Sequence, residues 1–399
     1  MSALYGTYAR SDLAFERGEG MRLYDQNGRE FLDFHSGIAV NALGHGDPHL
    51  VGALKAAADK VWHTSNVFTI PEQERLGQRL VDATFADRVF FTNSGAEALE
   101  CAIKTARHHF FSKGEPDRYE VIAFTGSFHG RTLGTIAAGG NPSYLEGFGP
   151  PMPGFKHTAP GDLDAVRALV GPQTCAILIE PVQGEGGVTA MSTEFLQGLR
   201  QICDEHGLLL ILDEVQCGFG RTGRFFAFEW AGITPDIVAV AKAIGGGFPL
   251  GACLATEEAA ASMVPGTHGS TYGGNPLGCA MGNAVLDRIQ GPGFMDHVAQ
   301  MGQRLAWHLQ QLAQRYPDYV LELRGKGLLA GIKIAPPVRD FVARLRDDHQ
   351  LLAIGAGDNV LRLLPPLIVT EADIEDAMNR IAAAFDAIEA ETATTASAS

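Results

Sequence analysis

The stretch LLLILDEVQCGFGRTG at residues 208–223, followed by PDIVAVAKAIGGGFP at 235–249, decides the fold class of this chain. Each stretch contains an aliphatic run of strand length, and each run is followed at once by a charged side chain, Asp213 in the first and Lys242 in the second. Similar runs alternate with stretches of helix length through the middle of the chain, a pattern typical of a mainly parallel α/β sheet covered by helices. The predicted strands are Arg88–Thr92, Glu120–Phe124, Cys175–Glu180, Leu208–Asp213, Asp236–Ala241 and Gly251–Thr256.

The spacing between these strands predicts how they are connected. After the first strand, apolar residues recur at Leu99, Ile103, Ala106 and Phe110, which is the spacing of an amphipathic helix. The segment Lys242–Leu250 between the last two strands is shorter than the dozen or so residues that a parallel crossover needs. We therefore expect the last strand to run antiparallel to its neighbours.

The two ends of the chain differ from the middle. We expect residues 61–290 to form a large domain, and residues 1–60 and 291–390 to build a smaller α+β domain together. The Ala/Thr/Ser-rich segment 391–399 is expected to be a disordered tail. The strand candidates at the ends are Met21–Phe34, Tyr319–Leu323, Leu328–Ile334 and Val360–Leu364, and the helix candidates are Met295–Tyr316 and Glu371–Ala390.

Composition excludes several classes of function. The 399 residues include 31 Lys plus Arg against 46 Asp plus Glu, a net charge of −15, so no basic field attracts nucleic acid. No apolar run approaches the roughly 20 residues of a spanning helix, and Met1–Arg10 does not resemble a signal peptide. We expect a soluble, cytoplasmic protein without a membrane partner. The six cysteines lack metal-site spacing and are predicted to be core residues: Cys101, Cys175, Cys203, Cys217, Cys253 and Cys279.

Ligands of open parallel sheets bind beyond the carboxyl ends of the strands, so the residues at those ends are candidates for a site. Asn93–Glu97 is a turn of small and polar residues that leads directly into the predicted helix. The start of a helix presents free N–H groups and the positive end of its dipole, which suit a phosphate. Taken alone, an ordinary helix cap at Ser94 explains the same turn.

Asp213 and Lys242 end neighbouring apolar strands, where an isolated charge is costly. Asp213 implies a nearby cation, unless it is simply solvated. Magnesium, as in P-loop ATPases, is poorly supported because the chain has no G-x-x-x-x-G-K-[ST] motif. Lys242 could be paired, neutralised or used as a Schiff base with an aldehyde.

Gly218–Gly223 matches the G-x-G-x-x-G motif of dinucleotide-binding folds, but the match is weak. Asp213–Cys217 separates it from the apolar part of the strand, and the next strand ends in Lys242 rather than in an acidic residue. A phosphate cup, a carboxylate and a lysine at successive strand ends instead match the three attachments of pyridoxal 5′-phosphate.

Five segments of the chain resemble the class III, ω-amino-acid aminotransferases, which are pyridoxal-phosphate enzymes of fold type I. The similarity extends from about residue 5 to residue 385. It implies a large domain with a mainly parallel seven-stranded sheet and a smaller α+β domain. The five segments are Asn93–Glu97, Ser127–Thr132, Glu180–Gly187, Asp213–Gly223 and Pro235–Lys242.

The resemblance also implies how the cofactor is held. Lys242 would bind its aldehyde and move the substrate proton, Asp213 would hold the ring nitrogen, and Gln216 the phenolic oxygen. Phe128 and Val215 would clamp the two faces of the ring. The phosphate contacts implied are Ser94, Gly95 and Ala96, with Thr271 from the neighbouring subunit of a homodimer.

Substrate recognition is implied in the same way. Arg131 and Arg362 match two arginines that bind carboxylates, for which a planar guanidinium is suited. Glu185 matches a glutamate that pairs with the arginine at the position of Arg362 when the amine end of an ω-amino substrate arrives, and releases it for an α-carboxylate. Ser270 is a further predicted substrate contact.

Within this family, Gly37–Asn41 and Leu361–Leu367 resemble the enzymes that pass the δ-amino group of N2-acetylornithine to 2-oxoglutarate in a ping-pong cycle of arginine biosynthesis. The alternatives are other class III donors, namely succinylornithine, N-succinyl-diaminopimelate, ornithine and 4-aminobutyrate, or a binding protein of this architecture without turnover. Leu99 replaces the usual Asn of the family and should change packing only. We expect no direct catalytic role for His129 and a structural one for Glu214.

Overall fold

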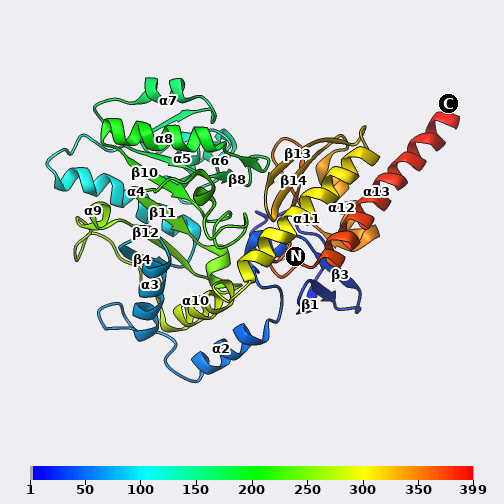
Figure 1. The fold of residues 1–399 in the computed structure, drawn as a ribbon, viewed down its shortest axis with the longest axis horizontal. Helices are drawn as coiled ribbons and strands as arrows, with labels where there is room; N and C mark the ends of the chain where they lie inside the picture. The colour runs from blue at the N-terminus through cyan, green and yellow to red at the C-terminus, as the bar shows by residue number, and fades with distance from the viewer. Residues whose placement is uncertain (1–2, 399) are drawn as a thin grey trace.

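The computed structural model describes residues 3–398, and its larger unit is built around a seven-stranded sheet (Figure 1). All pairings in this sheet are parallel except those of one strand, β12, which runs antiparallel to both of its neighbours. This confirms the mainly parallel sheet and the antiparallel last strand. In spatial order the strands are β4 (Arg88–Thr92), β12 (Gly251–Ala255), β11 (Ile237–Val240), β10 (Leu209–Asp213), β7 (Thr174–Ile179), β5 (Glu120–Phe124) and β6 (Phe155–Thr158).

Helices cover both faces of this sheet. Alternate residues of a strand point to opposite faces, and in β10 they enter two separate apolar clusters. Leu210 and Leu212 pack in the cluster that contains α8 (Thr193–His206), whereas Leu209 and Ile211 pack in the one that contains α4 (Gly95–Ser112). Burial on both faces explains why the strands are continuous aliphatic runs rather than alternating ones.

Leu99 and the six cysteines, which the sequence predicts to be packing residues, are buried in the structure. Leu99, at the position where the family usually has Asn, is fully buried on the sheet side of α4. All six cysteines are buried and free, which confirms their prediction as core residues. The other helices of this unit are α2 (Pro48–Ala58), α3 (Pro71–Ala83), α5 (Leu133–Gly139), α6 (Pro142–Leu145), α7 (Leu163–Leu169), α9 (Glu257–Ala260) and α10 (Pro276–Ile289). α2 lies within residues 1–60, which we expected in the smaller domain, but it packs on α10 of the larger unit.

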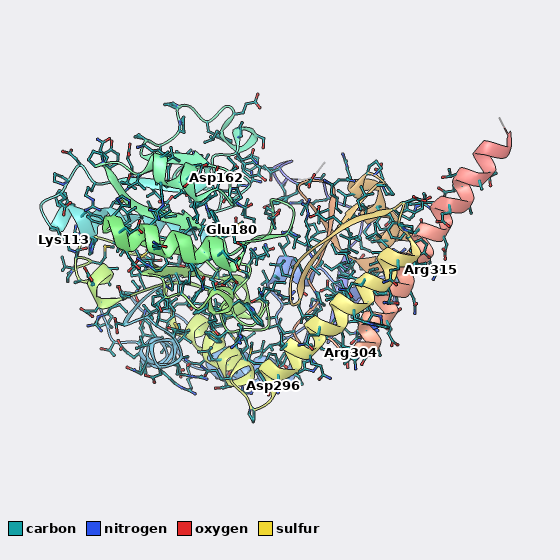
Figure 2. All side chains as sticks on the ribbon, turned by 45° about the horizontal axis from the view of Figure 1, so that its top comes forward. Lys113, Asp162, Glu180, Asp296, Arg304 and Arg315 are labelled. Atoms are coloured by element: carbon teal, nitrogen blue, oxygen red, sulfur yellow. The ribbon has the colours of Figure 1, made fainter. Side chains whose placement is uncertain are left out.

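The first and last parts of the chain meet in a smaller unit. β3 (Glu30–Asp33) pairs in parallel with β15 (Leu351–Leu352), which joins segments that are far apart in sequence. α11 (Phe294–Arg315) begins beside α10 near Asp296 and runs along this unit to Arg315 (Figure 2). Its remaining elements are α1 (Ser36–Ala39), β1 (Phe15–Glu19), β2 (Arg22–Asp25), β13 (Val320–Lys326), β14 (Leu329–Ile334), α12 (Val338–His349), β16 (Ile354–Ala356), β17 (Val360–Leu363) and α13 (Glu371–Ala398).

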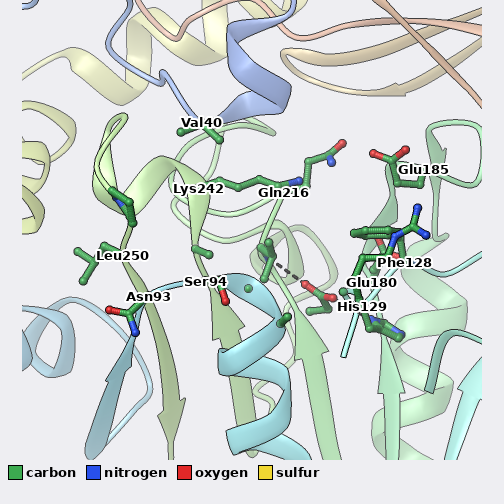
Figure 3. A pocket seen from close by; sticks show the side chains of 18 of the residues that line it. Val40, Asn93, Ser94, Phe128, His129, Glu180, Glu185, Gln216, Lys242 and Leu250 are labelled. Carbon is green, nitrogen blue, oxygen red and sulfur yellow. Dashed lines mark hydrogen bonds and ion pairs between the residues drawn. The ribbon is translucent and has the colours of Figure 1, made fainter. Parts of the chain in front are cut away.

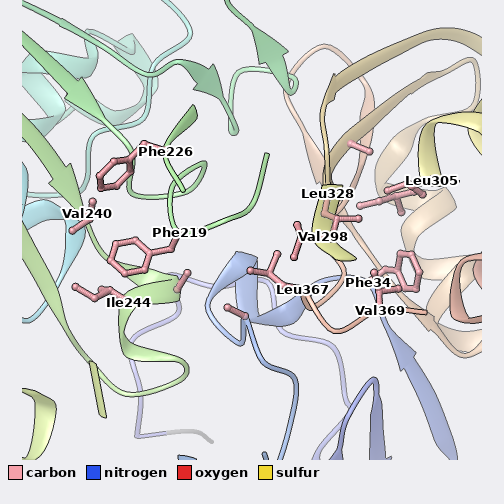
Figure 4. Packing of buried hydrophobic residues seen from close by; sticks show 14 of the residues in the cluster. Phe34, Phe219, Phe226, Val240, Ile244, Val298, Leu305, Leu328, Leu367 and Val369 are labelled. Carbon is pink, nitrogen blue, oxygen red and sulfur yellow. The ribbon is translucent and has the colours of Figure 1, made fainter. Parts of the chain in front are cut away.

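One apolar cluster connects the two units. It extends from Phe219 and Phe226 of the larger unit to Leu328 and Leu367 of the smaller one (Figure 4). Apolar packing therefore fixes the position of the smaller unit relative to the large sheet. No helix among residues 3–398 combines the length and the apolar character needed to cross a bilayer.

The C-terminus differs from the sequence expectation. α13 continues as a helix through residues 391–398, a segment that we expected to be disordered; residue 399 lies outside the described part. Alanine has the highest helix propensity, and Arg344 on α12 holds Glu391 with an ion pair of 2.8 Å. The prediction of disorder, which rested on the low hydrophobicity of this segment alone, was therefore wrong, because the segment extends a helix that is already packed.

Candidate active site

A cavity of about 440 Å³ lies at the carboxyl edge of the large sheet (Figure 3). Segments that follow five of its strands, β4, β5, β7, β10 and β11, contribute to the wall, as the strand-end rule predicts. The lining residues are Val40, Asn93, Ser94, Gly95, Ala96, Phe128, His129, Gly130, Arg131, Glu180, Glu185, Asp213, Val215, Gln216, Ala241, Lys242, Gly247, Phe248, Pro249 and Leu250.

Lys242 enters this cavity from the end of β11. Its backbone has a φ of +53°, in the left-handed region that residues other than glycine rarely adopt. Its side chain extends across the cavity toward Gln216 (Figure 3), and within residues 3–398 its Nζ has no hydrogen bond or ion pair. Burial, followed by the charge of Arg362, lowers the pKa of Lys242 from 10.5 to about 8. The amine is therefore much closer to its neutral, nucleophilic form at neutral pH than an ordinary lysine.

Asp213 is buried at the end of β10 and is held by two donors. Its Oδ2 lies 2.8 Å from His129 Nδ1, and its Oδ1 accepts a hydrogen bond of 3.0 Å from the Val215 N–H. Burial alone would lower the pKa of His129, but the hydrogen bond and the charge of Asp213 together raise it. The His129 ring therefore orients the Asp213 carboxyl group at the cavity wall.

His129 thus has a role that sequence reasoning missed. We expected no direct part in catalysis, and its position is consistent with this because its Nδ1 serves Asp213. Its place beside Phe128, among the polar residues that follow β5, could have marked His129 as a site residue. The spacing of the sequence, however, does not predict its contact with a carboxylate 84 residues away.

A second buried carboxylate, Glu180, lies at the end of β7. It accepts hydrogen bonds from the Phe128 and Gly184 N–H groups at 2.8 and 3.3 Å. Burial, and then the charge of Asp213, raises the pKa of Glu180 to about 7. The sequence analysis gave this residue no role of its own, although it ends a predicted strand and begins the Glu180–Gly187 segment of the resemblance. The strand-end rule applied to Asp213 would also have selected it.

Glu214, next to Asp213, points away from the cavity. Its carboxylate accepts hydrogen bonds from the Ala227 and Phe228 N–H groups at 3.0 and 2.9 Å and from Cys217 Sγ. Burial raises the pKa of Glu214 to about 7. These contacts confirm the structural role expected for it.

The start of α4 fits an anion. Ser94 caps the helix by accepting a hydrogen bond from the Glu97 N–H, and among the described residues the N–H groups of Gly95 and Ala96 have no hydrogen-bond partner. A Cβ atom on Gly95 would lie 2.7 Å from Val215 Cγ1, so glycine lets this turn pack closely against Val215. The helix cap at Ser94 therefore does not exclude a phosphate site at the same turn, because it leaves these two N–H groups unpaired among the described residues.

The remaining predicted cofactor contacts face the same space. Phe128 and Val215 both line the cavity. Gln216 Oε1 accepts a hydrogen bond of 3.0 Å from Arg362 Nη1. This contact orients the amide so that its NH₂ group is available as a donor. The donor set therefore suits a phosphorylated aromatic aldehyde: an amine, an anion site, a carboxylate and two ring contacts.

Arg362 does not lie on the cavity wall. It is fully buried behind Glu185 and Gln216, and its Nη1 lies 2.7 Å from Glu185 Oε1. Its Nε and Nη2 are buried without a hydrogen-bond partner. The arrangement places Glu185 between the cavity and a cation that has unused donors.

Ser270 and Thr271 are not brought to this cavity within one chain. Both line a separate cavity of about 1020 Å³ together with Phe91, and Ser270 reaches the Lys242 cavity only through a 3.5 Å contact with Asn93 Nδ2. Arg131, in contrast, is on the wall of the Lys242 cavity.

A family model described as aminotransferase class-III matches residues 7–385. The chain belongs to the class-III aminotransferase family. The family membership confirms the predicted enzyme class, a transaminase, and the predicted cofactor, pyridoxal 5′-phosphate.

Individual relatives of this class-III aminotransferase cover nearly its whole length. It is 60 % identical over 382 residues to an acetylornithine aminotransferase of Mesorhizobium japonicum, with 96 % of each chain covered. The N-acetylornithine aminotransferase of Stenotrophomonas maltophilia superposes with a TM-score of 0.84 at 36 % identity, covering 96 % of this chain and 98 % of that one. The ornithine aminotransferase of Toxoplasma gondii gives 0.93 at 31 % identity, with 98 % and 94 % covered. These neighbours confirm the fold class.

Proposed function

We propose that this aminotransferase moves the δ-amino group of N2-acetylornithine to 2-oxoglutarate in a two-step ping-pong cycle. The products are N-acetyl-L-glutamate 5-semialdehyde and L-glutamate, and the cycle serves arginine biosynthesis in the cytoplasm. The observation that carries the choice of an ω-amino donor is the pair between Glu185 and Arg362 at the edge of the Lys242 cavity. Relatives of nearly full length that are named acetylornithine aminotransferase support the same donor.

Pyridoxal 5′-phosphate supplies an aldehyde that accepts the amino group and a ring that stores the electrons of the broken C–H bond. Lys242 would attach it and move the proton at the reacting carbon, because among the described residues that line this cavity it is the lysine. Asp213, which is held by His129, would bind the ring nitrogen. Phe128 and Val215 would fix the plane of the ring, and the N–H groups of Gly95 and Ala96, with Ser94, would bind the phosphate.

Arg362 and Arg131 bind different parts of the substrate in this proposal. With Glu185 on Arg362, the charge of this arginine is already paired, which suits the uncharged chain next to a δ-amine. When Glu185 moves away, the buried Nε and Nη2 of Arg362 have no other partner and can bind the α-carboxylate of glutamate. Arg131 binds the carboxylate at the far end of the substrate.

The functional unit in this proposal is a homodimer. Large apolar side chains are exposed beside the segment that holds Ser270 and Thr271, and Trp62, Phe68 and Tyr272 retain 63, 67 and 63 % of their accessible surface. Exposed apolar patches of this kind commonly mark interfaces. A second copy that covers them would bring Thr271 to the phosphate of its neighbour and Ser270 to the substrate.

A panel of amino donors tests the choice of substrate. We expect kcat/KM to be highest for N2-acetylornithine when it is compared with succinylornithine, N-succinyl-diaminopimelate, ornithine and 4-aminobutyrate at fixed 2-oxoglutarate. A preference of more than about tenfold, or roughly 1.4 kcal/mol, for ornithine or 4-aminobutyrate would assign this enzyme a different donor within its family.

Glu185→Ala should separate the two half-reactions. Without Glu185, Arg362 faces the uncharged chain as an unpaired cation, at a cost of about 1–3 kcal/mol or roughly 5- to 150-fold in the rate with acetylornithine. The half-reaction with glutamate, which uses Arg362 directly, should change less than about threefold. Single-turnover absorbance changes measure both rates. Glu194→Ala, on the exposed side of α8, is the control; equal losses in both half-reactions of Glu185→Ala would rule out the switch.

A further inference from the structure

Arg131 is held in an unusual way for a residue that binds substrate. Its guanidinium carbon lies 3.7 Å from the centre of the Tyr144 ring and 5.5 Å from that of Phe128. The two rings themselves meet edge to face, with centroids 6.0 Å apart at 89°. Arg131, Tyr144 and Phe128 thus form one contiguous group, which we call the aromatic bracket.

The bracket leaves the guanidinium free to bind. No carboxylate of residues 3–398 forms an ion pair with Arg131, although the chain carries 46 acidic residues. A ring stacked on the face of a guanidinium does not use its N–H donors, which all point outward in the plane. An exposed arginine would otherwise distribute over many rotamers, so stacking preorganises the donors for a planar anion.

Tyr144 itself lies outside the wall of the cavity, on α6. Asn141 caps this short helix by accepting a hydrogen bond of 3.0 Å from the Ser143 N–H. The Tyr144 hydroxyl has no hydrogen-bond partner among the described residues. What Tyr144 offers Arg131 is therefore the face of its ring.

We propose that Tyr144 is a positioning residue that holds Arg131 for the carboxylate at the far end of the substrate. This inference rests on the proposed function. In N2-acetylornithine the carboxylate lies at the far end from the reacting δ-amine, and in glutamate the γ-carboxylate lies at the far end from the reacting α-amine. Tyr144 therefore serves both half-reactions, whereas Glu185 serves only one.

Tyr144→Leu removes the ring and keeps an apolar side chain. We expect KM to rise about 3- to 30-fold for both N2-acetylornithine and 2-oxoglutarate, while kcat changes less than about threefold. Tyr144→Phe, which keeps the ring, should retain the KM values of the parent enzyme, and Tyr144→Trp should do so if Tyr144→Leu does not fold. Cofactor absorbance and the thermal unfolding midpoint establish that each variant is folded and loaded.

Tyr24→Leu is a matched control. Tyr24 stacks on Arg17 at 3.7 Å, the same distance as in the bracket, but lies in the smaller unit outside the cavity. Its loss should leave both KM values unchanged. A Tyr144→Leu enzyme with parental KM values, or a Tyr144→Phe enzyme as impaired as Tyr144→Leu, would overturn the role of the ring.

Arg131→Gln separates failure of this inference from failure of the proposed function. If both hold, Arg131→Gln raises both KM values, and adding Tyr144→Leu changes them little further, because residues that act together are not additive. If Arg131→Gln raises KM but Tyr144→Leu does not, the bracket is refuted and the proposed function stands. If Arg131→Gln leaves both KM values unchanged, Arg131 is not the carboxylate site and both are overturned.

Discussion

Lys242→Ala is expected to lower kcat for transamination by about 10⁴-fold or more, while the protein still binds pyridoxal 5′-phosphate. The loss is expected to be large because, in the proposed function, Lys242 on the cavity wall both attaches the cofactor and moves the proton. Binding persists because the N–H groups at the start of α4, the ring contacts and Asp213 are unchanged. Single-turnover absorbance with N2-acetylornithine and the cofactor content after dialysis measure the two effects.

The control for this variant is another lysine. Lys113 follows α4 and pairs with Glu258 on the surface, so Lys113→Ala should retain the parental kcat. Turnover of Lys242→Ala within about tenfold of the parent enzyme would exclude Lys242 from the chemistry. The lowered pKa of Lys242, about 8, is a property of the same buried environment and explains how the amine can react at neutral pH.

Asp213→Asn should lower kcat by about 100- to 1,000-fold, the range found when one preorganised electrostatic contact is removed from a reacting centre. The substitution keeps size and removes charge, so the ring nitrogen loses the partner that keeps it protonated. His129 also loses the carboxylate that raises its pKa. Steady-state kcat and the absorbance of the bound cofactor check the prediction.

Glu214→Gln is the matched control, because Glu214 is also buried and adjacent in sequence. Its carboxylate serves backbone N–H groups at Ala227 and Phe228 rather than the cavity. We expect it to lower the thermal unfolding midpoint and to leave kcat of the folded enzyme within about threefold. Equal kcat losses in Asp213→Asn and Glu214→Gln would mean that Asp213 acts through structure rather than through its charge.

The large sheet could be predicted closely from the sequence, because strands buried on both faces must be aliphatic throughout. β4 and β5 begin and end at the predicted residues, and the short connection before β12 dictated its antiparallel direction. β6 was missed because it is an edge strand whose four residues are only partly buried. The helix at 391–398 was missed because its anchor, Arg344, is distant in sequence.

The candidate site was predictable where a residue's place in the fold dictates its chemistry. Asp213 and Lys242 end neighbouring strands, so their placement at one edge follows from parallel pairing. The contact of His129 with Asp213 and the stacking of Arg131 on Tyr144 depend on side-chain packing between distant segments, which no local pattern encodes. The pairing of Glu185 with Arg362 was implied by the family resemblance, whereas the complete burial of Arg362 was visible only in the structure.

The central claim is that Lys242 and Asp213 hold opposite ends of one pyridoxal 5′-phosphate molecule. A crystal structure of the holoenzyme tests it most directly. The account predicts continuous density from Lys242 Nζ to the cofactor aldehyde carbon and a ring nitrogen about 2.6–3.2 Å from an Asp213 oxygen. Density for the cofactor joined to another lysine, or a ring nitrogen facing away from Asp213, would contradict it.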